Sequence, residues 1–357
     1  MEYCGIDAHS KSSTVYVMDE SGNKLIEGKV PSTKAGLEKK IEDFDKEMRI
    51  IIEACSSSRA VIKHLQEIGF KDVIVVNPQA TAQMRARGKK TDYVDAHGLA
   101  ELGRLGLSEA WKVHMPGEWA QRIRDLLYQR EYVVKHRVGA INRAYAIFRR
   151  EGKQAPSLKS DKGWAAAIQI LPEHEEELQS LRVIRGYYLD WEIKLTKQIT
   201  SEIKKHPQYK LVNSVPCVGP LTAAALLACI DDISRFRSGK ALASYFGIAP
   251  SVFQTGATER MGGITKRGNS LARKFLAQAA HHARYSSNAF NPIYRDLVHK
   301  KSTSIAVMTV ARKIAVSVYA VMKHNEPFDP TKMGLVKVDE EIKFVRVYER
   351  AHKVQAV

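Results

Sequence analysis

The pattern that most constrains the fold lies in the first hundred residues, where short strand-like segments precede helix-like ones. Three strand-like segments come first, at residues 3–8, 14–18 and 24–30, and the turn-forming residues 21–23 (Ser-Gly-Asn) separate the second from the third. Successive strands joined by short turns are typical of an antiparallel meander. We therefore expect the chain to begin with three antiparallel strands.

After these strands the pattern changes to alternating helices and strands. The predicted elements are helix 34–47, strand 49–53, helix 59–69, strand 72–76 and helix 92–105. Three strands followed by alternating helices and strands is the element order of an RNase H-like α/β domain. We expect this domain to end near Pro116-Gly117, and we assign it residues 1–115.

The rest of the chain is predicted to be mainly helical. Between residues 118 and 205 apolar residues recur at helical spacing among arginines and lysines, which indicates a long, coiled-coil-like helical hairpin broken around 152–157. A charged helical segment of this kind is typical of a spacer or a dimerisation surface. We assign it residues 116–207, followed by a mainly α C-terminal domain at 208–330 and a C-terminal tail at 331–357.

A helix-hairpin-helix-like unit is predicted at VPCVGPLTAAALLACI in the C-terminal domain. Pro216, Gly219 and Pro220 punctuate two helical segments through a tight turn. In such a unit the turn glycine lets backbone N–H groups approach a phosphate at a helix N-terminus. Gly219 is therefore a candidate nucleic-acid contact, and a plain helix-helix turn is the alternative.

An excess of positive charge indicates which class of molecule the chain binds. The chain has 56 lysines and arginines against 39 acidic residues, a formal net charge of +17. A surface with this potential favours a polyanion, and nucleic acid is the leading candidate. A ribosomal or membrane surface is the alternative that charge alone leaves open.

The compartment is predicted from cysteines and apolar runs. The four cysteines lie far apart, without CxxC pairs or zinc-ligand spacing, and are predicted to be buried thiols in a reducing compartment. The longest apolar run, 221–230, is about half the ~20 residues of a membrane span, and the stretch 305–322 contains Arg312 and Lys313. The N-terminus has no secretory-signal pattern. We expect a cytoplasmic protein that does not bind membranes.

Acidic residues stand where two apolar strands end. Asp7 ends the first strand in the sequence GIDAHS, and Glu53 closes the isoleucine-rich strand in IIIEAC. A carboxylate at the end of an apolar strand is costly unless it is paired or bound to a metal. Two such carboxylates indicate a shared ligand.

A second carboxylate pair opens a predicted helix. Asp92 and Asp95 are three residues apart in TDYVDAHGLA, which places both on one helix face near the positive end of the helix dipole. They would repel one another without a cation. Together with Asp7 and Glu53 they suit two Mg²⁺ ions, which prefer oxygen ligands and stabilise the attacking and leaving oxygens at a phosphate. Mn²⁺ is the expected substitute.

Each of these carboxylates also has a structural alternative. Asp92 can serve as a helix cap or first-turn residue, Asp7 as a turn-former, and Glu53 as the salt-bridge partner of an arginine. The combination of four in this element order favours the metal site.

Four sequence blocks resemble one known family. The blocks are GIDAHS, IIIEAC, NPQATAQMRARGKKTDYVDA and GIAPSVFQTGATERMGGITKRGNSLARKFL. In this order they are similar to the DEDD transposases of bridge-RNA-guided insertion sequences and to the related Piv-type DNA invertases. The resemblance covers nearly the whole chain, and KKTDYVDA and GGITKRGN are its specific signals.

This resemblance implies a role for each region. Residues 1–115 would form a RuvC-like metal-binding catalytic domain, 116–207 a helical linker used in oligomerisation, and 208–330 a transposase domain that supplies a nucleophile. In the family a serine immediately before a glycine attacks the DNA, whereas here Thr255 precedes Gly256. Threonine keeps the hydroxyl but adds a β-methyl that restricts its rotamer and crowds in-line attack. We therefore expect a slower or a disabled nucleophile.

Basic residues flank both predicted parts of the site. One cluster directly precedes Asp92 and a second follows Thr255. Most basic clusters are solvated faces, but one beside phosphodiester chemistry has a phosphate to hold. The candidate nucleic-acid contacts are Arg85, Arg87, Lys89, Lys90, Lys266, Arg267, Arg273 and Lys274.

The predicted function is an insertion-sequence transposase that cuts and rejoins DNA strands by Mg²⁺-dependent chemistry with a hydroxyl nucleophile. The resemblance implies a structured guide RNA and assembly as a dimer or tetramer, beside donor and target DNA. The alternatives are a RuvC-like metal-dependent nuclease in which water attacks, a DNA invertase, and a catalytically silent nucleic-acid-binding derivative. Formation of a covalent protein-DNA adduct separates the recombinase from the nuclease and the silent protein.

Overall fold

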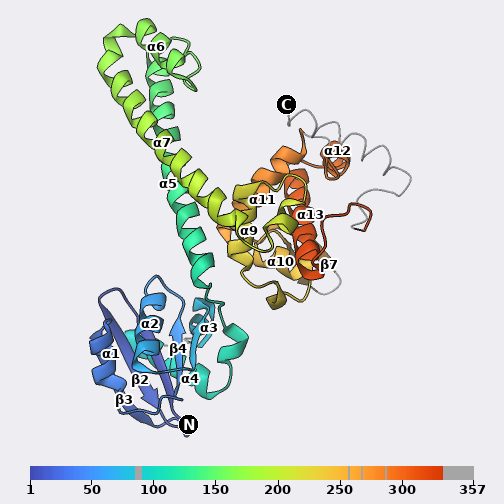
Figure 1. Ribbon diagram of the computed structural model, residues 1–357. Helices are drawn as coiled ribbons and strands as arrows, with labels where there is room; N and C mark the ends of the chain where they lie inside the picture. Colours follow the sequence, from blue (N-terminus) through green and yellow to red (C-terminus); the bar gives the residue numbers. More distant parts are fainter. Residues whose placement is uncertain (85–90, 256–257, 267, 286–287, 333–357) are drawn as a thin grey trace. The chain divides into compact units, whose positions relative to one another are not determined.

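Five strands form one mixed sheet in the N-terminal part of the computed structural model. The structure describes residues 1–84, 91–255, 258–266, 268–285 and 288–332 (Figure 1). The chain divides into two compact units, residues 1–115 and residues 116–357, each with its own core.

The sheet of the N-terminal unit has the order β3-β2-β1-β4-β5. Its strands are β1 (Tyr3–Ala8), β2 (Ser12–Met18), β3 (Lys24–Pro31), β4 (Arg49–Glu53) and β5 (Val73–Val76). The first three strands pair antiparallel, whereas β4 runs parallel to β1 and β5 runs parallel to β4. This confirms the predicted antiparallel meander and places β1 at the centre of the sheet.

Helices cover both faces of this sheet. They are α1 (Lys34–Ile41), α2 (Ser58–Ile68), α3 (Pro78–Met84), α4 (Asp92–Arg104) and a 3-10 turn η1 (Ser108–Trp111). Ile50 and Ile52 of β4 pack in one core with residues of α1 and α2, whereas Ile51 packs in a second core with residues of α3 and α4. The alternation follows from the two-residue period of a strand, and it explains why β4 is apolar throughout.

The first helix is shorter than the sequence pattern predicts. It ends at Ile41 rather than at residue 47. The Asp45 carboxylate accepts a hydrogen bond from the Glu47 N–H at 2.9 Å, and the Met48 N–H donates to the Asp45 carbonyl. These local bonds compete with helical ones, so the chain turns and delivers the buried Met48 into the core.

A long helical hairpin begins the second unit. It consists of α5 (Glu118–Arg150), α6 (Asp161–Ile170), the 3-10 turn η2 (Pro172–His174) and α7 (Glu175–Lys204). A separate small core at the tip of the hairpin is built around Trp164 and Phe148.

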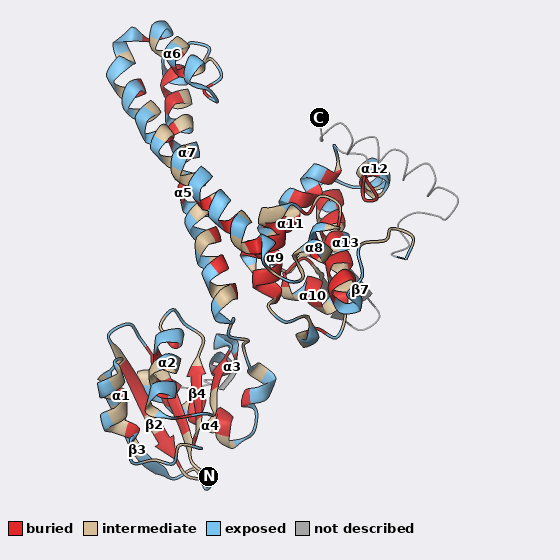
Figure 2. Cartoon of the chain, viewed as in Figure 1, coloured by how far each residue is buried: buried red, intermediate tan, exposed pale blue. Residues whose placement is uncertain are grey.

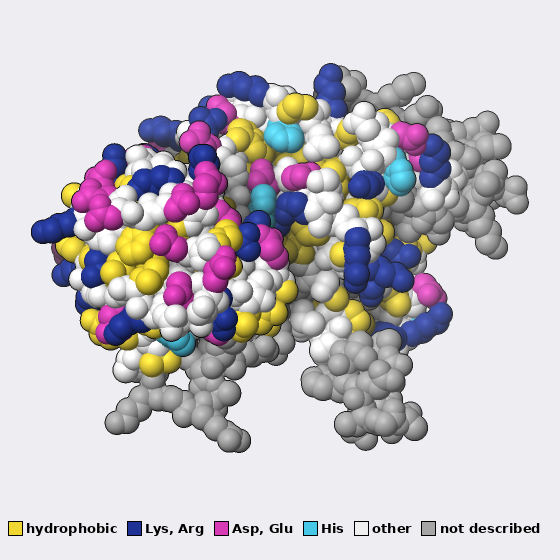
Figure 3. Space-filling view, turned by 90° about the horizontal axis from the view of Figure 1, so that it is seen from below, with side chains coloured by type: hydrophobic (Ala, Val, Ile, Leu, Met, Phe, Trp, Pro, Cys, Tyr) yellow, Lys and Arg dark blue, Asp and Glu magenta, His cyan; other side chains and the backbone are white. Residues whose placement is uncertain are grey.

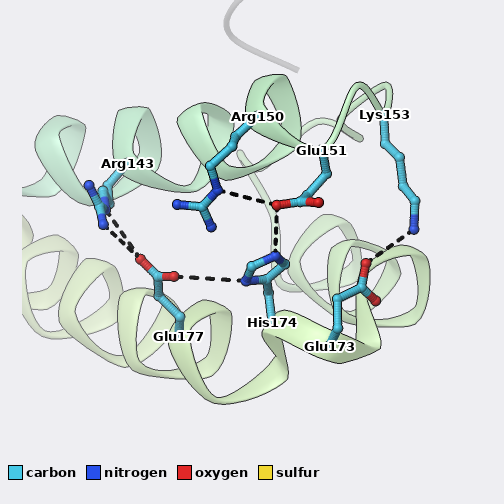
Figure 4. Close-up of polar contacts among 7 residues, drawn as sticks. All are labelled: Arg143, Arg150, Glu151, Lys153, Glu173, His174 and Glu177. Carbon is cyan, nitrogen blue, oxygen red and sulfur yellow. Dashed lines mark hydrogen bonds and ion pairs between the residues drawn. The ribbon is translucent and has the colours of Figure 1, made fainter.

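Polar contacts close the tip of the hairpin (Figure 4). His174 lies 3.1 Å from Glu151 and 4.0 Å from Glu177, and Lys153 lies 3.3 Å from Glu173. The contacts of Glu151 and Lys153 join the residues that follow α5 to η2, which directly precedes α7.

The remaining elements pack around the base of this hairpin. They are α8 (Tyr209–Asn213), α9 (Pro220–Ile230), η3 (Ile233–Arg235), α10 (Gly239–Tyr245), β6 (Pro250–Thr255), β7 (Thr258–Ile264), α11 (Ser270–Ala283), α12 (Asn291–Lys300) and α13 (Thr303–His324). Helix α9 is buried along nearly its whole length (Figure 2). Ile123 of α5 and Ile199 of α7 belong to the same core as α9. The region is mostly helical, as predicted, and the β6-β7 hairpin is an element that the sequence pattern did not predict.

Helix α13 is long and apolar enough to cross a membrane by length and composition alone. In the structure 56% of the most apolar 18-residue stretch of α13 is buried, and the helix packs against α10, α11 and α12. These contacts make it the core helix of the second unit.

The prediction of four buried thiols is wrong for two of them. Cys4 and Cys229 are buried, whereas Cys55 is exposed and Cys217 is partly exposed. Cys55 lies in the loop after β4, where its Sγ is 3.1 Å from the Ala8 carbonyl oxygen. The prediction rested on the spacing of the cysteines, which excludes a zinc site but does not determine whether a cysteine in a loop or turn is buried.

Replacing Gly5 by alanine is expected to destabilise the N-terminal unit by about 3 kcal/mol. A Cβ at Gly5 would lie 1.9 Å from the Ala96 carbonyl oxygen of α4, so the helix would have to move away from the sheet. Gly139→Ala is the matched control, because a Cβ there meets nothing within 4 Å and alanine favours the helix by about 0.5–1 kcal/mol. Urea unfolding of both variants tests this, and an unchanged midpoint for Gly5→Ala would contradict the packing.

Candidate functional site

A row of polar side chains crosses three strands of the sheet. Asp7 of β1 lies opposite Thr14 of β2, and Thr14 lies opposite Lys29 of β3. Directly opposite residues on paired strands point to the same face. Gly5 identifies that face, because it precedes Asp7 by two residues and lies against the backbone of Ala96 in α4. The row therefore faces helix α4.

Helix α4 begins with two carboxylates in its first turn. Thr91 caps the helix by accepting a hydrogen bond from the Val94 N–H at 3.3 Å, and Asp92 and Asp95 follow directly. The Asp92 side chain is 43% exposed, whereas Asp95 is buried. The helix thus presents one carboxylate at the surface and one against the sheet.

Three side chains meet beside the C-terminal end of β1. His9 Nε2 lies 3.4 Å from Asp7 Oδ2 and 3.8 Å from Asp92 Oδ1. One possible ligand atom from each of Asp7, His9 and Asp92 lies within 4.8 Å of the other two. Lys29 Nζ approaches the second carboxylate oxygen of Asp92 at 3.2 Å.

Glu53 and Asp95 act on this group through their charges. Burial raises the pKa of the Asp7 carboxyl, the neighbouring His9 lowers it, and the negative charges of Asp95, Asp92 and Glu53 raise it again, so that the pKa ends above its ordinary value. The structure therefore brings all four predicted carboxylates into one electrostatic environment, with Asp7 and Asp92 in the closest group.

This donor set fits a hard divalent cation. Mg²⁺ and Mn²⁺ prefer carboxylate oxygens, and Mn²⁺ also accepts imidazole nitrogen. Burial and, to a smaller extent, the neighbouring carboxylates raise the pKa of Asp7, and a bound cation would offset both effects.

The sequence analysis did not select His9 or Lys29 for this site. Lys29 lies 63 positions from Asp92 in the chain and reaches it only through the strand register. His9 was a visible candidate, because it follows Asp7 by two residues. His97, also close to the carboxylates in sequence, instead contacts the Tyr16 ring edge-on, with 4.9 Å between ring centroids.

The predicted nucleophile position lies in the second unit. Thr255 ends β6 and pairs with Thr258 at the start of β7. Its backbone is therefore at the end of a two-stranded hairpin. Ser251, the nearest serine, donates a hydrogen bond from its Oγ to the Gly263 carbonyl oxygen at 2.9 Å.

The predicted nucleic-acid contacts have different surroundings. Arg85, Arg87, Lys89, Lys90 and Arg267 lie outside the described residues. Lys266 is exposed and adopts a left-handed backbone conformation, and Gly219 is the N-cap residue of α9. Arg273 donates to the Phe246 carbonyl oxygen at 3.0 Å, and Lys274 pairs with Glu131 of α5. Arg273 and Lys274 thus also hold α11 in place.

Two family models match the chain. Residues 4–150 match a transposase model of the DEDD, IS110 type, and residues 209–295 match the model described as "Transposase IS116/IS110/IS902 family". The chain belongs to the IS110-family DEDD transposases. The prediction of a transposase enzyme is thereby confirmed.

Proteins similar to this transposase along most of their length are named as transposases or as a gene-inverting protein. A probable family 20 transposase of Pseudomonas aeruginosa is 23% identical over 81% of this chain and 89% of its own length. The transposase for insertion sequence element IS1111A of Coxiella burnetii is 22% identical over 78% of this chain and 79% of its own length. The pilin gene-inverting protein of Moraxella bovis is 27% identical over 79% of this chain and 82% of its own length. Membership of this family implies DNA as the substrate and the use of a divalent metal.

Replacing Asp92 by asparagine is expected to weaken Mn²⁺ binding about tenfold or more, because the change removes a charged oxygen ligand. Isothermal titration of the full chain with Mn²⁺ measures the affinity. Glu67→Gln removes an exposed carboxylate of α2 that pairs with Lys63, away from the group, and should leave binding unchanged. Equal Mn²⁺ affinity in Asp92→Asn and the parent would rule Asp92 out as a ligand.

Replacing Lys29 by methionine is expected to tighten Mn²⁺ binding a few-fold. The substitution removes a cation 3.2 Å from Asp92, and an exposed pair at this distance is worth at most about 1 kcal/mol. Lys29→Arg keeps the charge and should match the parent. Weaker Mn²⁺ binding in Lys29→Met would instead make Lys29 a support of the site.

Proposed function

We propose that this transposase cuts and rejoins DNA strands by metal-dependent phosphodiester chemistry. Asp7, Glu53, Asp92 and Asp95 would hold Mg²⁺, with Mn²⁺ as a substitute, and Thr255 would supply the attacking hydroxyl. The observation that carries the proposal is the meeting of Asp7 and Asp92 around His9, with Asp95 and Glu53 in the same electrostatic environment.

The arrangement of the N-terminal unit supports an RNase H-like, RuvC-like fold. Three antiparallel strands are followed by two strands parallel to the first, and α4 covers one face. In this arrangement residues 1–115 would be the metal-binding catalytic domain. The polar row from Asp7 to Lys29 lies on the α4 side of the sheet.

Two features of the second unit support its proposed roles. The turn before α9 contains Cys217 in a left-handed conformation and Gly219 at the N-cap, which favours a helix-hairpin-helix-like unit in residues 208–330. Exposed apolar side chains along α7, including Val183 and Tyr187, favour an oligomerisation surface in residues 116–207. Assembly as a dimer or tetramer follows from this proposal.

The side chains of the site have distinct proposed tasks. A divalent metal would supply charge stabilisation at the scissile phosphate. Asp7 and Asp92 would hold it together with Glu53 and Asp95, and His9, which lies close to both Asp7 and Asp92, would keep these two carboxylates at a fixed separation. Lys29 partly neutralises Asp92 and offers an ammonium group to a backbone phosphate.

In the proposed strand cleavage, the Thr255 hydroxyl attacks phosphorus. The bond from Oγ to phosphorus forms, the bond from phosphorus to a deoxyribose oxygen breaks, the hydroxyl loses its proton and the departing oxygen gains one. Rejoining reverses these changes with a different strand end. The β-methyl of threonine restricts the approach, so the step should be slower than with serine.

A structured guide RNA is a further proposed partner. The net charge of +17 is compatible with holding a folded RNA through its phosphates. Lysine and arginine side chains are spread among acidic ones on the face in Figure 3. The burial of α13 in the core supports action in the cytoplasm, away from membranes.

The pilin gene-inverting relative supports DNA inversion as a second candidate function. A nuclease that uses water, and a silent nucleic-acid-binding derivative, are the alternatives without a covalent step. Inversion and transposition share the protein-DNA adduct, whereas cleavage without an adduct indicates the nuclease, and binding without cleavage indicates the silent derivative.

The Thr255→Ser variant is expected to accumulate more covalent protein-DNA adduct than the parent, by about tenfold, because serine lacks the β-methyl. The adduct is measured by denaturing electrophoresis after incubation with donor DNA and Mg²⁺. Thr255→Val and Asp92→Asn should give none, and Ser251→Ala should match the parent. Equal or less adduct in Thr255→Ser would overturn the role of residue 255.

A further inference from the structure

A buried threonine lies in the middle of the polar row that runs from Asp7 to Lys29. Thr14 of β2 is fully buried, and its hydroxyl oxygen has no hydrogen-bond partner among the residues that the structure describes. A buried hydroxyl without a partner is costly. Valine has nearly the same shape and also favours strands, so neither the strand nor the core requires this hydroxyl.

The side chain of Thr14 points to the face of the sheet that α4 covers. The next residue, Val15, belongs to the core that contains residues of α1 and α2, and successive side chains of a strand point to opposite faces. Two residues after Thr14, Tyr16 contacts His97 of α4. The hydroxyl of Thr14 is therefore enclosed between the sheet and the helix that begins with Asp92.

The charged groups of the candidate metal site lie on both sides of Thr14. Asp7 and Lys29 are directly opposite Thr14 on the two neighbouring strands, which places Cβ atoms roughly 4.5–5.5 Å apart. Lys29 Nζ reaches Asp92 at 3.2 Å, and His9 lies 3.4 Å from Asp7 and 3.8 Å from Asp92. Both neighbours of Thr14 are thus linked to Asp92 on the same face of the sheet.

The carboxylates around Thr14 are turned toward cationic groups. Asp92 has one oxygen near His9 and the other near Lys29, and Asp7 also turns an oxygen to His9. None of the described residues accepts a hydrogen bond from the Thr14 hydroxyl. A hydrated divalent cation brings oxygens of its own, because Mg²⁺ usually keeps several waters when protein carboxylates bind it. Such a cation would supply the missing acceptor.

We propose that Thr14 is a positioning residue of the metal site, whose hydroxyl donates a hydrogen bond to an oxygen of the hydrated cation. The inference rests on the proposed metal binding by the four carboxylates, and it requires neither Thr255 nor nucleic acid. It gives β2, which carries none of those carboxylates, a part in holding the cation. Groups that hydrogen-bond to the ligands of a metal typically change its affinity by about tenfold or more.

Mn²⁺ binding by two variants of Thr14 tests the inference. The full chain is titrated with Mn²⁺ in a calorimeter, without nucleic acid. Thr14→Val keeps the shape but removes the hydroxyl, and it should weaken Mn²⁺ binding by about tenfold. Thr14→Ser keeps the hydroxyl and should restore most of the affinity of the parent. In urea without metal, Thr14→Val should unfold at the same or a higher concentration than the parent, because it removes a buried hydroxyl that has no partner.

Ser108→Ala is the matched control. Ser108 is also fully buried, and its hydroxyl likewise has no partner within the described part of the chain. It lies in η1, beyond the C-terminal end of α4, whereas Asp92 begins that helix. Ser108→Ala should bind Mn²⁺ as the parent does. An equal loss of affinity in this variant would make the effect a general result of removing a buried hydroxyl, and would overturn the inference.

Other outcomes separate this inference from the proposed function. Equal Mn²⁺ affinity in Thr14→Val and the parent would overturn the role of Thr14 and leave the carboxylate site standing. A lower urea midpoint for Thr14→Val without metal would reveal a partner within the chain and would also overturn that role. If the parent binds no Mn²⁺, the proposed metal site fails and this inference fails with it. A parent that binds Mn²⁺ but forms no protein-DNA adduct counts only against the proposed strand transfer.

Discussion

The close approach of α4 to β1 is the contact on which the N-terminal unit depends. Gly5 lies so near the Ala96 carbonyl that no side chain fits between them, and Gly103 allows a similar approach to Ile51 of β4. Because the helix rests directly on the strands, its first turn brings Asp92 and Asp95 to the strand ends that carry Asp7 and Glu53. A helix held a few ångströms farther away by ordinary side chains would separate Asp92 and Asp95 from Asp7 and Glu53.

Sequence patterns predicted the N-terminal sheet well because its signals are local. Strand 3–8 has the predicted bounds, and helix α4 differs by one residue from the prediction. The errors lie where short-range bonds override periodicity, as after Ile41, or where an element is small, as at β6 and β7. The carboxylates were visible in sequence because Asp7 and Glu53 end apolar strands, and Asp92 and Asp95 open a helix three residues apart.

The neighbours of those carboxylates could not be predicted in the same way. Lys29 reaches Asp92 because two successive pairings, Asp7 with Thr14 and Thr14 with Lys29, put these residues in one row. A shift of one residue in either pairing would send the lysine to the opposite face. Register is a property of two strands at once, so no single segment of sequence contains it. The roles of the four carboxylates and of Thr255 in catalysis stay predictions.

The second unit combines a long hairpin with a compact base in a single folding unit. Ile123 and Ile199 lie in the core that also holds α9 and α13, while Phe148 and Trp164 form another core at the far end of the same helices. Helix α5 runs through 33 residues between these ends, which corresponds to about 50 Å at the usual rise per residue. Since packing anchors both ends, the hairpin keeps its tip and its base at a fixed separation. A partner that bound both ends at once would have to span that length.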